Sequence, residues 1–367
     1  MSERVNVAKT VSGDADEIVI ESDFEKLAEE ISKLPVEGRK CLIVTDSNVG
    51  PLYLTEVAEK IKPVFSEVFA MQIPAGEENK TLNTVRTVLV KLISSHFDRK
   101  DFILALGGGV VGDLAGFASS VYLRGIKFIQ VPTTLLSQTD SSIGGKTGVD
   151  FDAYKNMVGA FHQPSLVYMN MSVLKTLPGR EFASGMGEIL KHGLIRDEEY
   201  YSWLVNNFNE ITDREPEVLE HMIARSCEIK AAVVEEDPTE QGIRAILNFG
   251  HTLGHAIEKY MNFSFTHGEC VALGSIAAAW ISYKRGNLSD MEFYEIRDMF
   301  VPFGLPITLP DDADVNKILE ISKSDKKMDG KKVKFILLKK PGKAVIDTTV
   351  TDEEMLDALQ NMIITLD

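Results

Sequence analysis

Three histidines and a glutamate stand out as residues that together could bind a metal ion. His251 and His255 are four residues apart in the segment HTLGH, so a helix would place both imidazoles on one face. His267 follows at a turn before the next predicted helix, and Glu188 comes from another helical segment. Two imidazoles and a carboxylate, with coordination positions left open, are typical of a catalytic zinc-type site.

Each of these histidines, taken alone, would more often be a buried core side chain or a helix cap than a metal ligand. Three of the seven histidines nevertheless fall between residues 251 and 267. That clustering, together with Glu188, favours the metal site. The spacing does not decide whether His251, His255 or both bind the ion.

A glycine-rich turn could bind the pyrophosphate of a dinucleotide. Gly107, Gly109 and Gly112 follow the apolar run DFILAL and open an apolar helix, where backbone N–H groups can hold phosphate oxygens. An ordinary strand-to-helix turn would explain the same glycines. The acidic residue usual about twenty positions downstream is missing, and the acidic strand end lies upstream, at Asp46. The sequence therefore predicts a nucleotide site of non-standard layout, or none.

Several cationic and amide side chains occupy otherwise apolar or glycine-rich segments. Lys146 stands in the loop GGKTG, which lacks the spacing of an ATP-binding phosphate loop. The others are Lys155, Asn156, Lys191, Lys230, Arg244 and Asn248. Singly, each is typical of a solvated face. Their density near the glutamate and histidine motifs predicts a substrate with more than one negative charge.

The elements that must position these residues change in kind along the chain. The first third alternates β-branched apolar runs with helical periodicity, which predicts an α/β, doubly wound parallel sheet that binds ligands at its carboxyl edge. Strands are predicted at 17–20, 41–45, 64–73, 102–106 and 128–131, and helices at 52–61 and 81–94. From about Ser172 helical periodicity dominates, with helices predicted at 174–194, 217–235, 246–260, 268–285 and 289–300. We therefore expect a nucleotide-binding domain at 1–171 and a mainly helical metal- and substrate-binding domain at 172–367.

Composition excludes some classes of function. The formal net charge of −16 argues against a nucleic-acid partner, which would need a basic face. Cys41, Cys227 and Cys270 are few, odd in number and far apart, which is typical of a reducing compartment. The first residues show no signal-peptide pattern, and the apolar stretch 271–281 is too short to span a bilayer. We expect a cytoplasmic protein that binds neither nucleic acid nor membrane.

Taken together in chain order, these segments resemble the 3-dehydroquinate synthase family over most of the chain. The resemblance is carried by LALGGGVVGDLAGF, YLRGIKFIQVPTTLLSQTDSSIGGKTGV, KNMVGAFHQP, LPGREFASGMGEILKHG, LNFGHTLGHAIE and THGECVALG. It implies an enzyme that uses NAD and one divalent metal, zinc or cobalt, and that works as a homodimer. The implied reaction converts 3-deoxy-D-arabino-heptulosonate 7-phosphate, a seven-carbon sugar-acid phosphate, to 3-dehydroquinate and phosphate.

The resemblance also assigns roles to individual residues. Glu188, His251 and His267 would be the metal ligands, which leaves His255 as an acid–base residue near the phosphate, and Arg124 would reach the phosphate of the neighbouring subunit. Substrate hydroxyls, ring oxygen and carboxylate would lie near Asp140, Lys191 and Lys230. The anionic groups would be bound by Lys146, Asn156, Arg244, Asn248 and one of Lys326 or Lys327. The NAD contacts would be Asp46, Asn48, Glu77, Lys80, Gly109, Asp113, Thr133, Thr134, Lys146 and Lys155.

The chain departs from the family pattern at two places. Thr139 stands where a small apolar residue usually precedes Asp140, and DFDAY at 150–154 replaces a stretch that commonly reads Asn-His-Pro-x-Gly. These departures concern the conformation of a loop more than activity.

Related functions remain as alternatives. One is a sugar-phosphate cyclase that makes a 2-deoxy-scyllo-inosose or 2-epi-5-epi-valiolone ring, although the GGKTG loop with Arg244 and Asn248 favours a carboxylate-bearing substrate. Another is a metal-dependent polyol dehydrogenase, which would release NADH and usually has an Asp where Glu188 stands. A non-catalytic metal scaffold is disfavoured because structural zinc binds four protein ligands.

Overall fold

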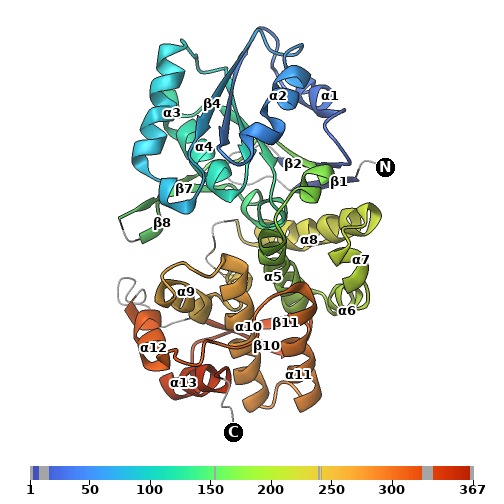
Figure 1. Cartoon of the computed structure of the whole chain (residues 1–367), viewed down its shortest axis with the longest axis vertical. Coiled ribbons are helices and arrows are strands. Elements are labelled where there is room, and N and C mark those ends of the chain that lie inside the picture. The colour runs from blue at the N-terminus through green and yellow to red at the C-terminus, as the bar shows by residue number, and fades with distance from the viewer. Residues whose placement is uncertain are drawn as a thin grey trace. The chain divides into compact units, whose positions relative to one another are not determined.

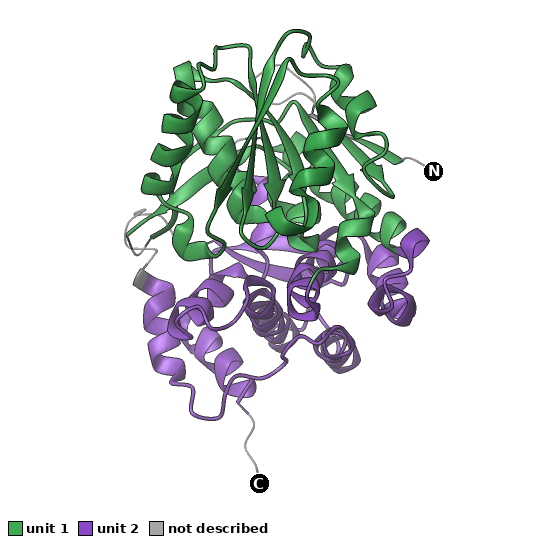
Figure 2. Ribbon diagram, turned by 45° about the horizontal axis from the view of Figure 1, so that its top comes forward, with its two compact units in different colours: residues 1–177, 219–238 green, residues 178–218, 239–367 purple. Residues whose placement is uncertain are grey.

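The computed structural model describes residues 3–7, 16–152, 154–238, 240, 242–324 and 334–363. The chain divides into two compact units (Figures 1 and 2). Unit 1 contains residues 1–177 and 219–238, and unit 2 contains residues 178–218 and 239–367. Lys326 and Lys327, which were predicted to bind an anion, lie outside the described residues.

Unit 1 is built on a seven-stranded sheet with the order β1-β2-β9-β6-β5-β3-β4. Its strands are β1 (Glu3–Val7), β2 (Asp16–Glu21), β3 (Lys40–Asp46), β4 (Glu67–Ile73), β5 (Phe102–Gly107), β6 (Lys127–Pro132) and β9 (Leu166–Asn170). Neighbouring strands are parallel throughout, except that β1 pairs antiparallel with β2 at one edge. The predicted doubly wound parallel sheet is confirmed.

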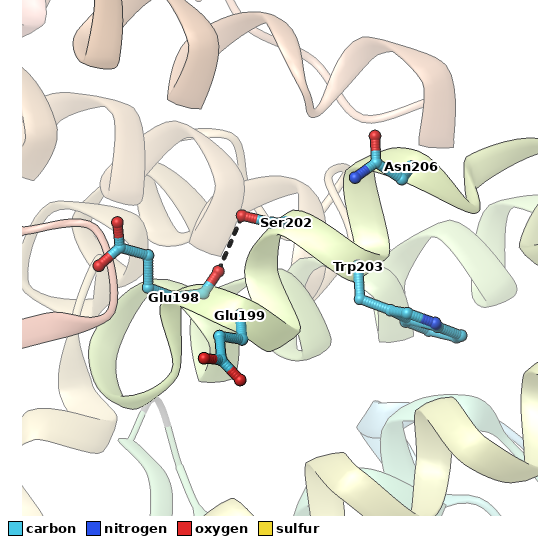
Figure 3. Close-up of a pocket in the computed structure, with 5 residues that line it drawn as sticks. All are labelled: Glu198, Glu199, Ser202, Trp203 and Asn206. Atoms are coloured by element: carbon cyan, nitrogen blue, oxygen red, sulfur yellow. Dashed lines mark hydrogen bonds between the residues drawn. The ribbon is translucent and has the colours of Figure 1, made fainter.

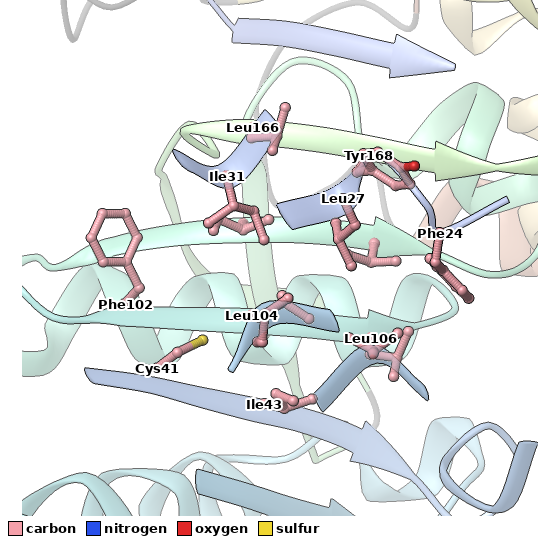
Figure 4. Close-up of a cluster of buried hydrophobic side chains, with 14 of the residues drawn as sticks. Phe24, Leu27, Ile31, Cys41, Ile43, Phe102, Leu104, Leu106, Leu166 and Tyr168 are labelled. Carbon is pink, nitrogen blue, oxygen red and sulfur yellow. The ribbon is translucent and has the colours of Figure 1, made fainter. Parts of the chain in front are cut away.

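Helices cover both faces of this sheet, so its central strands are apolar on both sides. One core contains Ile43 and Leu104, which pack with Leu27 and Ile31 of α1 (Figure 4). The opposite core contains the alternate strand residues, such as Leu42, together with residues of α3 and α4. The helices of unit 1 are α1 (Leu27–Ser32), α2 (Gly50–Ile61), α3 (Leu82–Ser94), α4 (Gly109–Val121) and most of α8 (Pro216–Glu236).

A separate hairpin, β7 (Lys146–Phe151) and β8 (Tyr154–Phe161), completes unit 1. The weak periodicity of residues 132–164 gave no strand prediction there, because the hairpin exposes much of its surface. The backbone N–H of Asp150 donates a hydrogen bond of 2.8 Å to the carbonyl of Lys80, which ties the hairpin to the segment after β4. Of the divergent stretch, Asp150 and Phe151 end β7, and Tyr154 begins β8.

Unit 2 is mainly helical, as predicted. Its helices are α5 (Gly179–Arg196), α6 (Glu198–Asn206), α7 (Phe208–Thr212), α9 (His251–Tyr260), α10 (His267–Lys284), α11 (Asp290–Asp298), α12 (Val315–Ser324) and α13 (Asp352–Asn361). A short hairpin, β10 (Phe335–Lys340) with β11 (Lys343–Asp347), lies before α13. α10 is buried on nearly every side and forms the core of the unit. Among the described residues, no helix is both long and apolar enough to cross a bilayer.

Candidate functional site

Glu188, His251 and His267 come together in unit 2 from three helices, α5, α9 and α10. Nε2 of His267 lies 3.2 Å from Oε1 of Glu188, and Nε2 of His251 lies 3.4 Å from the same oxygen. Ligands bonded tetrahedrally to zinc at about 2.0–2.1 Å are about 3.3 Å apart. The spacing of the donor atoms therefore fits an ion of this size.

The close crossing of α5 and α10 depends on two glycines beside these ligands. A Cβ atom on Gly268 would lie 1.9 Å from the carbonyl oxygen of Ser184, and one on Gly187 would lie 2.7 Å from the carbonyl oxygen of Gly268. Neither clash is with a side chain that could rotate away. The glycines therefore allow the two backbones to approach until Glu188 and His267 are within ligand distance.

His251 is the first residue of α9, and its ring is oriented by the backbone before it. Nδ1 of His251 lies 3.0 Å from the carbonyl oxygen of Phe249. Because a carbonyl only accepts, Nδ1 carries the proton and Nε2 keeps its lone pair for a metal. Gly250 has φ +78°, a left-handed conformation that favours glycine. This turn explains why the predicted helix 246–260 is interrupted and α9 begins at residue 251.

The charges in the triad suit metal binding. Glu188 is fully buried and forms an ion pair with Lys191 one turn along α5. Burial alone would raise the pKa of Glu188, but Lys191 and then the histidines lower it well below its usual value. Burial also lowers the pKa of His251 to about 3, against the opposing effect of Glu188. The carboxylate is therefore charged and the imidazole neutral, as metal ligands must be.

The start of α10, which carries His267, is held by a second set of contacts. Thr266 and Glu269 form a reciprocal capping box around the helix start. Nε and a terminal nitrogen of Arg180 donate to the two carboxylate oxygens of Glu269 at 2.9 and 2.7 Å. The Thr-x-x-Glu spacing could have revealed the capping box from the sequence. Arg180 could not be found in that way, because it lies far away along the chain.

His255 lies one turn beyond His251 on α9 and is exposed. Its ring centroid is 5.1 Å from that of His251 and 6.0 Å from that of His267. His255 is not in the triad formed with Glu188, but it forms a second group of ligand atoms with Glu258 and His267. Glu258 was not predicted, although its helical i, i+3 spacing from His255 was a signal for it.

The other predicted residues of unit 2 lie on elements that carry or adjoin the triad. Lys191 pairs with Glu188, as described above. Arg244, which is buried, and Asn248 lie on the short helical turn Ile243–Asn248, which ends two residues before Gly250. The side-chain amide of Asn248 donates to Oε1 of Glu240 at 3.0 Å.

In unit 1, most of the predicted NAD contacts gather at the carboxyl edge of neighbouring parallel strands. β4, β3, β5 and β6 are adjacent in the sheet, so the residues that follow them meet at one edge. Those residues are Asp46 and Asn48 after β3, Glu77 and Lys80 after β4, Gly109 and Asp113 after β5, and Thr133 and Thr134 after β6. Oδ1 of Asp46 accepts from the backbone N–H groups of Asn48 and Val49, which fixes the turn into α2.

Lys80 links this edge to the β7–β8 hairpin. Its Nζ donates to Oδ2 of Asp113 at 2.7 Å and to Oδ1 of Asn156 at 2.5 Å. Burial raises the pKa of Asp113 more than Lys80 lowers it. Nζ of Lys155 lies 4.0 Å from an oxygen of Glu77. Two hairpin residues predicted from the resemblance, Lys155 and Asn156, therefore lie close to residues at the carboxyl edge of the sheet. Lys146 is the first residue of β7, and its side chain is exposed.

Asp140 lies in a π-helical turn, Ser137–Ser141, a distortion that is frequent at functional sites. Nζ of Lys230, on α8, donates to the carbonyl oxygen of Asp140 at 2.5 Å and to its Oδ1 at 2.6 Å. The hydroxyl of Thr139 donates to the carbonyl of Leu135 at 2.9 Å. The unusual threonine is therefore accommodated without an unpaired hydroxyl.

Arg124 lies away from the carboxyl edge of the sheet in its own unit. α4 starts at that edge and has 13 residues, so it is about 20 Å long. Arg124 follows its far end and precedes β6, whose first residue pairs with the first residue of β5. Leu123 and Arg124 have φ of +49° and +71°, a strained conformation of the kind found at functional sites.

A surface hollow on α6 is separate from these residues (Figure 3). It is lined by Glu198, Glu199, Ser202, Trp203 and Asn206, none of which is a predicted site residue. Glu198 also pairs with Lys340, with 2.5 Å between Nζ and Oε2. The hollow contributes nothing to the candidate site.

Comparisons with protein families cover most of the chain. Residues 70–184 match the family profile described as "3-dehydroquinate synthase N-terminal". Residues 185–328 match the profile described as "3-dehydroquinate synthase C-terminal".

Individual relatives agree with these matches. A 3-dehydroquinate synthase of Acetivibrio thermocellus is 44% identical over 339 residues, which are 92% of this chain and 94% of that protein. One of Symbiobacterium thermophilum is 44% identical over 328 residues, 88% of this chain and 92% of that protein.

Solved structures also resemble the whole chain. A 2-deoxy-scyllo-inosose synthase complexed with carbaglucose-6-phosphate, NAD+ and Co2+ has a TM-score of 0.88 at 27% identity, covering 99% of this chain and 100% of that one. The 2-epi-5-epi-valiolone synthase of Streptomyces hygroscopicus, with NAD+ and Zn2+ bound, has a TM-score of 0.87 at 27% identity. The match covers 98% of this chain and 99% of that one.

Proposed function

This chain belongs to the 3-dehydroquinate synthase family. We propose that it performs the reaction of that family with the triad of Glu188, His251 and His267 and with the carboxyl edge of the parallel sheet. The substrate is 3-deoxy-D-arabino-heptulosonate 7-phosphate, and the products are 3-dehydroquinate and phosphate. The observation that carries the proposal is the triad of Glu188, His251 and His267, whose donor spacing fits a divalent ion inside a chain of this family.

The residues present fit both groups that the reaction needs. The triad offers two imidazoles and a carboxylate, which suit zinc or cobalt. The start of α4 has no side-chain cap among the described residues, so its backbone N–H groups can hold a pyrophosphate. We therefore place NAD on the N-terminal α/β domain, with the ribose near Asp46, and the metal on the helical domain.

When bound, NAD supplies a hydride acceptor that later returns the hydride, and the metal supplies a Lewis acid. The protein's own groups align the substrate and handle its charges. Lys146, Asn156, Arg244 and Asn248 bind the carboxylate and phosphate of the substrate by charge-assisted hydrogen bonds. His255 accepts and donates protons at its imidazole nitrogens as phosphate leaves.

The related cyclases named above are the main competing function, since solved structures of that kind share the fold. They are 27% identical to this chain, whereas the relatives named 3-dehydroquinate synthase are 44% identical. The glycine-rich loop with Lys146, together with Arg244 and Asn248, supports an anionic, carboxylate-bearing substrate. A polyol dehydrogenase is disfavoured by the glutamate at position 188.

Turnover is expected to release phosphate without net accumulation of NADH, because the hydride removed from the substrate returns to it. The purified protein is incubated with the seven-carbon phosphate, catalytic NAD and a divalent metal. Free phosphate, 3-dehydroquinate and the absorbance of reduced nicotinamide are followed together. Stoichiometric NADH would instead identify a dehydrogenase, and phosphate release without 3-dehydroquinate would contradict the proposed reaction.

We propose that the chain acts as a homodimer in which Arg124 completes the partner's phosphate pocket. Arg124 lies at the amino edge of the sheet in its own unit, away from the carboxyl edge where the predicted NAD contacts gather. The hairpin β7–β8 leaves four large apolar side chains between 45% and 63% exposed, namely Phe151, Tyr154, Met157 and Phe161. Exposed apolar clusters of this kind often mark protein interfaces.

Mixing two inactive variants under subunit exchange tests this arrangement. Arg124→Ala and Lys146→Ala are each expected to lose turnover efficiency by roughly a hundredfold, since each removes a charge-assisted contact to an anion. In a mixed dimer, both defects fall in one site and the other is intact, so up to half the activity returns. If Arg124 acts within its own subunit, each mixed site has one defect and no activity returns.

We also propose a cytoplasmic location. Cys41, Cys227 and Cys270 are all buried free thiols, which fits a reducing compartment.

A further inference from the structure

Next to the metal triad, α9 and α10 present a second group of ligand atoms. One donor atom each from His255, Glu258 and His267 lies within 4.8 Å of the other two. His255 and Glu258 are three residues apart on α9, so they share a face of that helix. His267 begins α10 and also belongs to the triad with Glu188. The group has the same donor types as the triad, two imidazoles and a carboxylate.

The size of this group suits a divalent ion after small adjustments. For three atoms no more than 4.8 Å apart, some point lies no more than about 2.8 Å from each of them. Zinc bonds to histidine and carboxylate are about 2.0–2.2 Å long, so each donor needs to move by less than about 1 Å. His255 is exposed, while Glu258, which is 5% exposed, provides a buried carboxylate.

We propose that His255, Glu258 and His267 form a second divalent-cation position, weaker than the first. It is weaker because it shares His267 with the triad. Nε2 of His267 faces Glu188 at 3.2 Å, so an ion in the second position binds Nδ1 and displaces its proton to solvent. An ion there engages His255, the residue that moves protons in the proposed function. Excess zinc or cobalt therefore inhibits turnover, a consequence that rests on the proposed function, whereas the binding itself does not.

Metal binding to the metal-free, full-length protein tests the proposal directly. Zn2+ content is measured by equilibrium dialysis across a range of free Zn2+, and Co2+ binding is followed by its absorption spectrum. Wild type is expected to bind two ions per chain, with affinities at least about tenfold apart. Glu258→Gln and His255→Asn are each expected to keep the tight site and lose the weak one. Glu353→Gln, which removes an exposed carboxylate on α13, is the matched control and binds two ions.

Binding of a single ion by wild type over the whole range would overturn the proposal, as would two ions bound by both Glu258→Gln and His255→Asn. Because His255 is exposed, its variant gives the answer even if Glu258→Gln folds poorly. Turnover is measured in parallel. The turnover of wild type is expected to rise with the first equivalent of Zn2+ and to fall with the second, whereas the turnover of Glu258→Gln is expected only to rise. Two-step binding in a protein that forms no 3-dehydroquinate would contradict the proposed function and leave this inference standing.

Discussion

His251→Ala is expected to lose bound metal and turnover together, whereas His255→Ala keeps the tightly bound metal and loses turnover. His251 supplies a nitrogen 3.4 Å from the carboxylate of Glu188, so its removal leaves two of three protein ligands. We expect at least about a hundredfold weaker metal binding, since even loss of an outer-shell partner costs 10–100-fold. Loss of a general acid–base group alone costs about 10²–10⁴ in rate.

The two variants are matched, because each removes one imidazole from the same face of α9. Metal content of the dialysed proteins and their turnover at saturating metal are both measured. Excess zinc should not restore His255→Ala, because its tight site is already full. A metal-free His255→Ala protein, or a His251→Ala protein with a full tight site, would show that the ligands are wrongly assigned.

Gly268→Ala is expected to lower both metal affinity and thermal stability. The new Cβ would lie 1.9 Å from the carbonyl oxygen of Ser184, so α5 and α10 must move apart. Overpacking of this kind typically costs about 1–3 kcal/mol in the free energy of unfolding. The same movement separates Glu188 on α5 from His267 on α10. Metal content and the unfolding midpoint of the metal-free protein measure the two effects.

Gly179→Ala is the matched control, since it adds the same methyl group at the start of α5. No atom lies within 4 Å of the added Cβ, and the residue does not have a positive φ. This variant should match wild type in metal content and be at least as stable, because alanine restricts the unfolded chain. If Gly268→Ala behaved in the same way, the close crossing could not be what sets the ligand spacing.

Much of the fold could be predicted from periodicity, because the central strands are buried on both faces and form continuous apolar runs. The strand predicted at 102–106 corresponds to β5, and the helix predicted at 268–285 corresponds to α10 within one residue at each end. Other elements were missed. They are the edge strand β1, the exposed hairpin of β7 and β8, the buried strand β9 and the helix α12.

The histidine cluster could be recognised in the sequence because His251 and His255 share one helix, α9, at a spacing of four residues, and His267 follows soon after. The other residues that position the site depend on contacts between distant segments. Arg180 fixes the start of α10 through Glu269, and Gly187 meets Gly268 across a helix crossing. Local sequence patterns carry no information about such pairs. The left-handed turn at Gly250 was missed for a related reason, since periodicity does not reveal the sign of φ.

The ion pair of Glu188 with Lys191 leads us to expect that the protein folds whether or not a metal ion is bound. A buried carboxylate left without a partner would strongly destabilise the protein once its ion departed. Lys191 forms an ion pair with this carboxylate inside the protein, so we expect the metal-free protein to keep its fold. A zinc finger, by contrast, unfolds when its ion is removed. We therefore expect ion exchange in the folded chain to be reversible, with the supply of zinc or cobalt around the protein helping to decide which ion it carries.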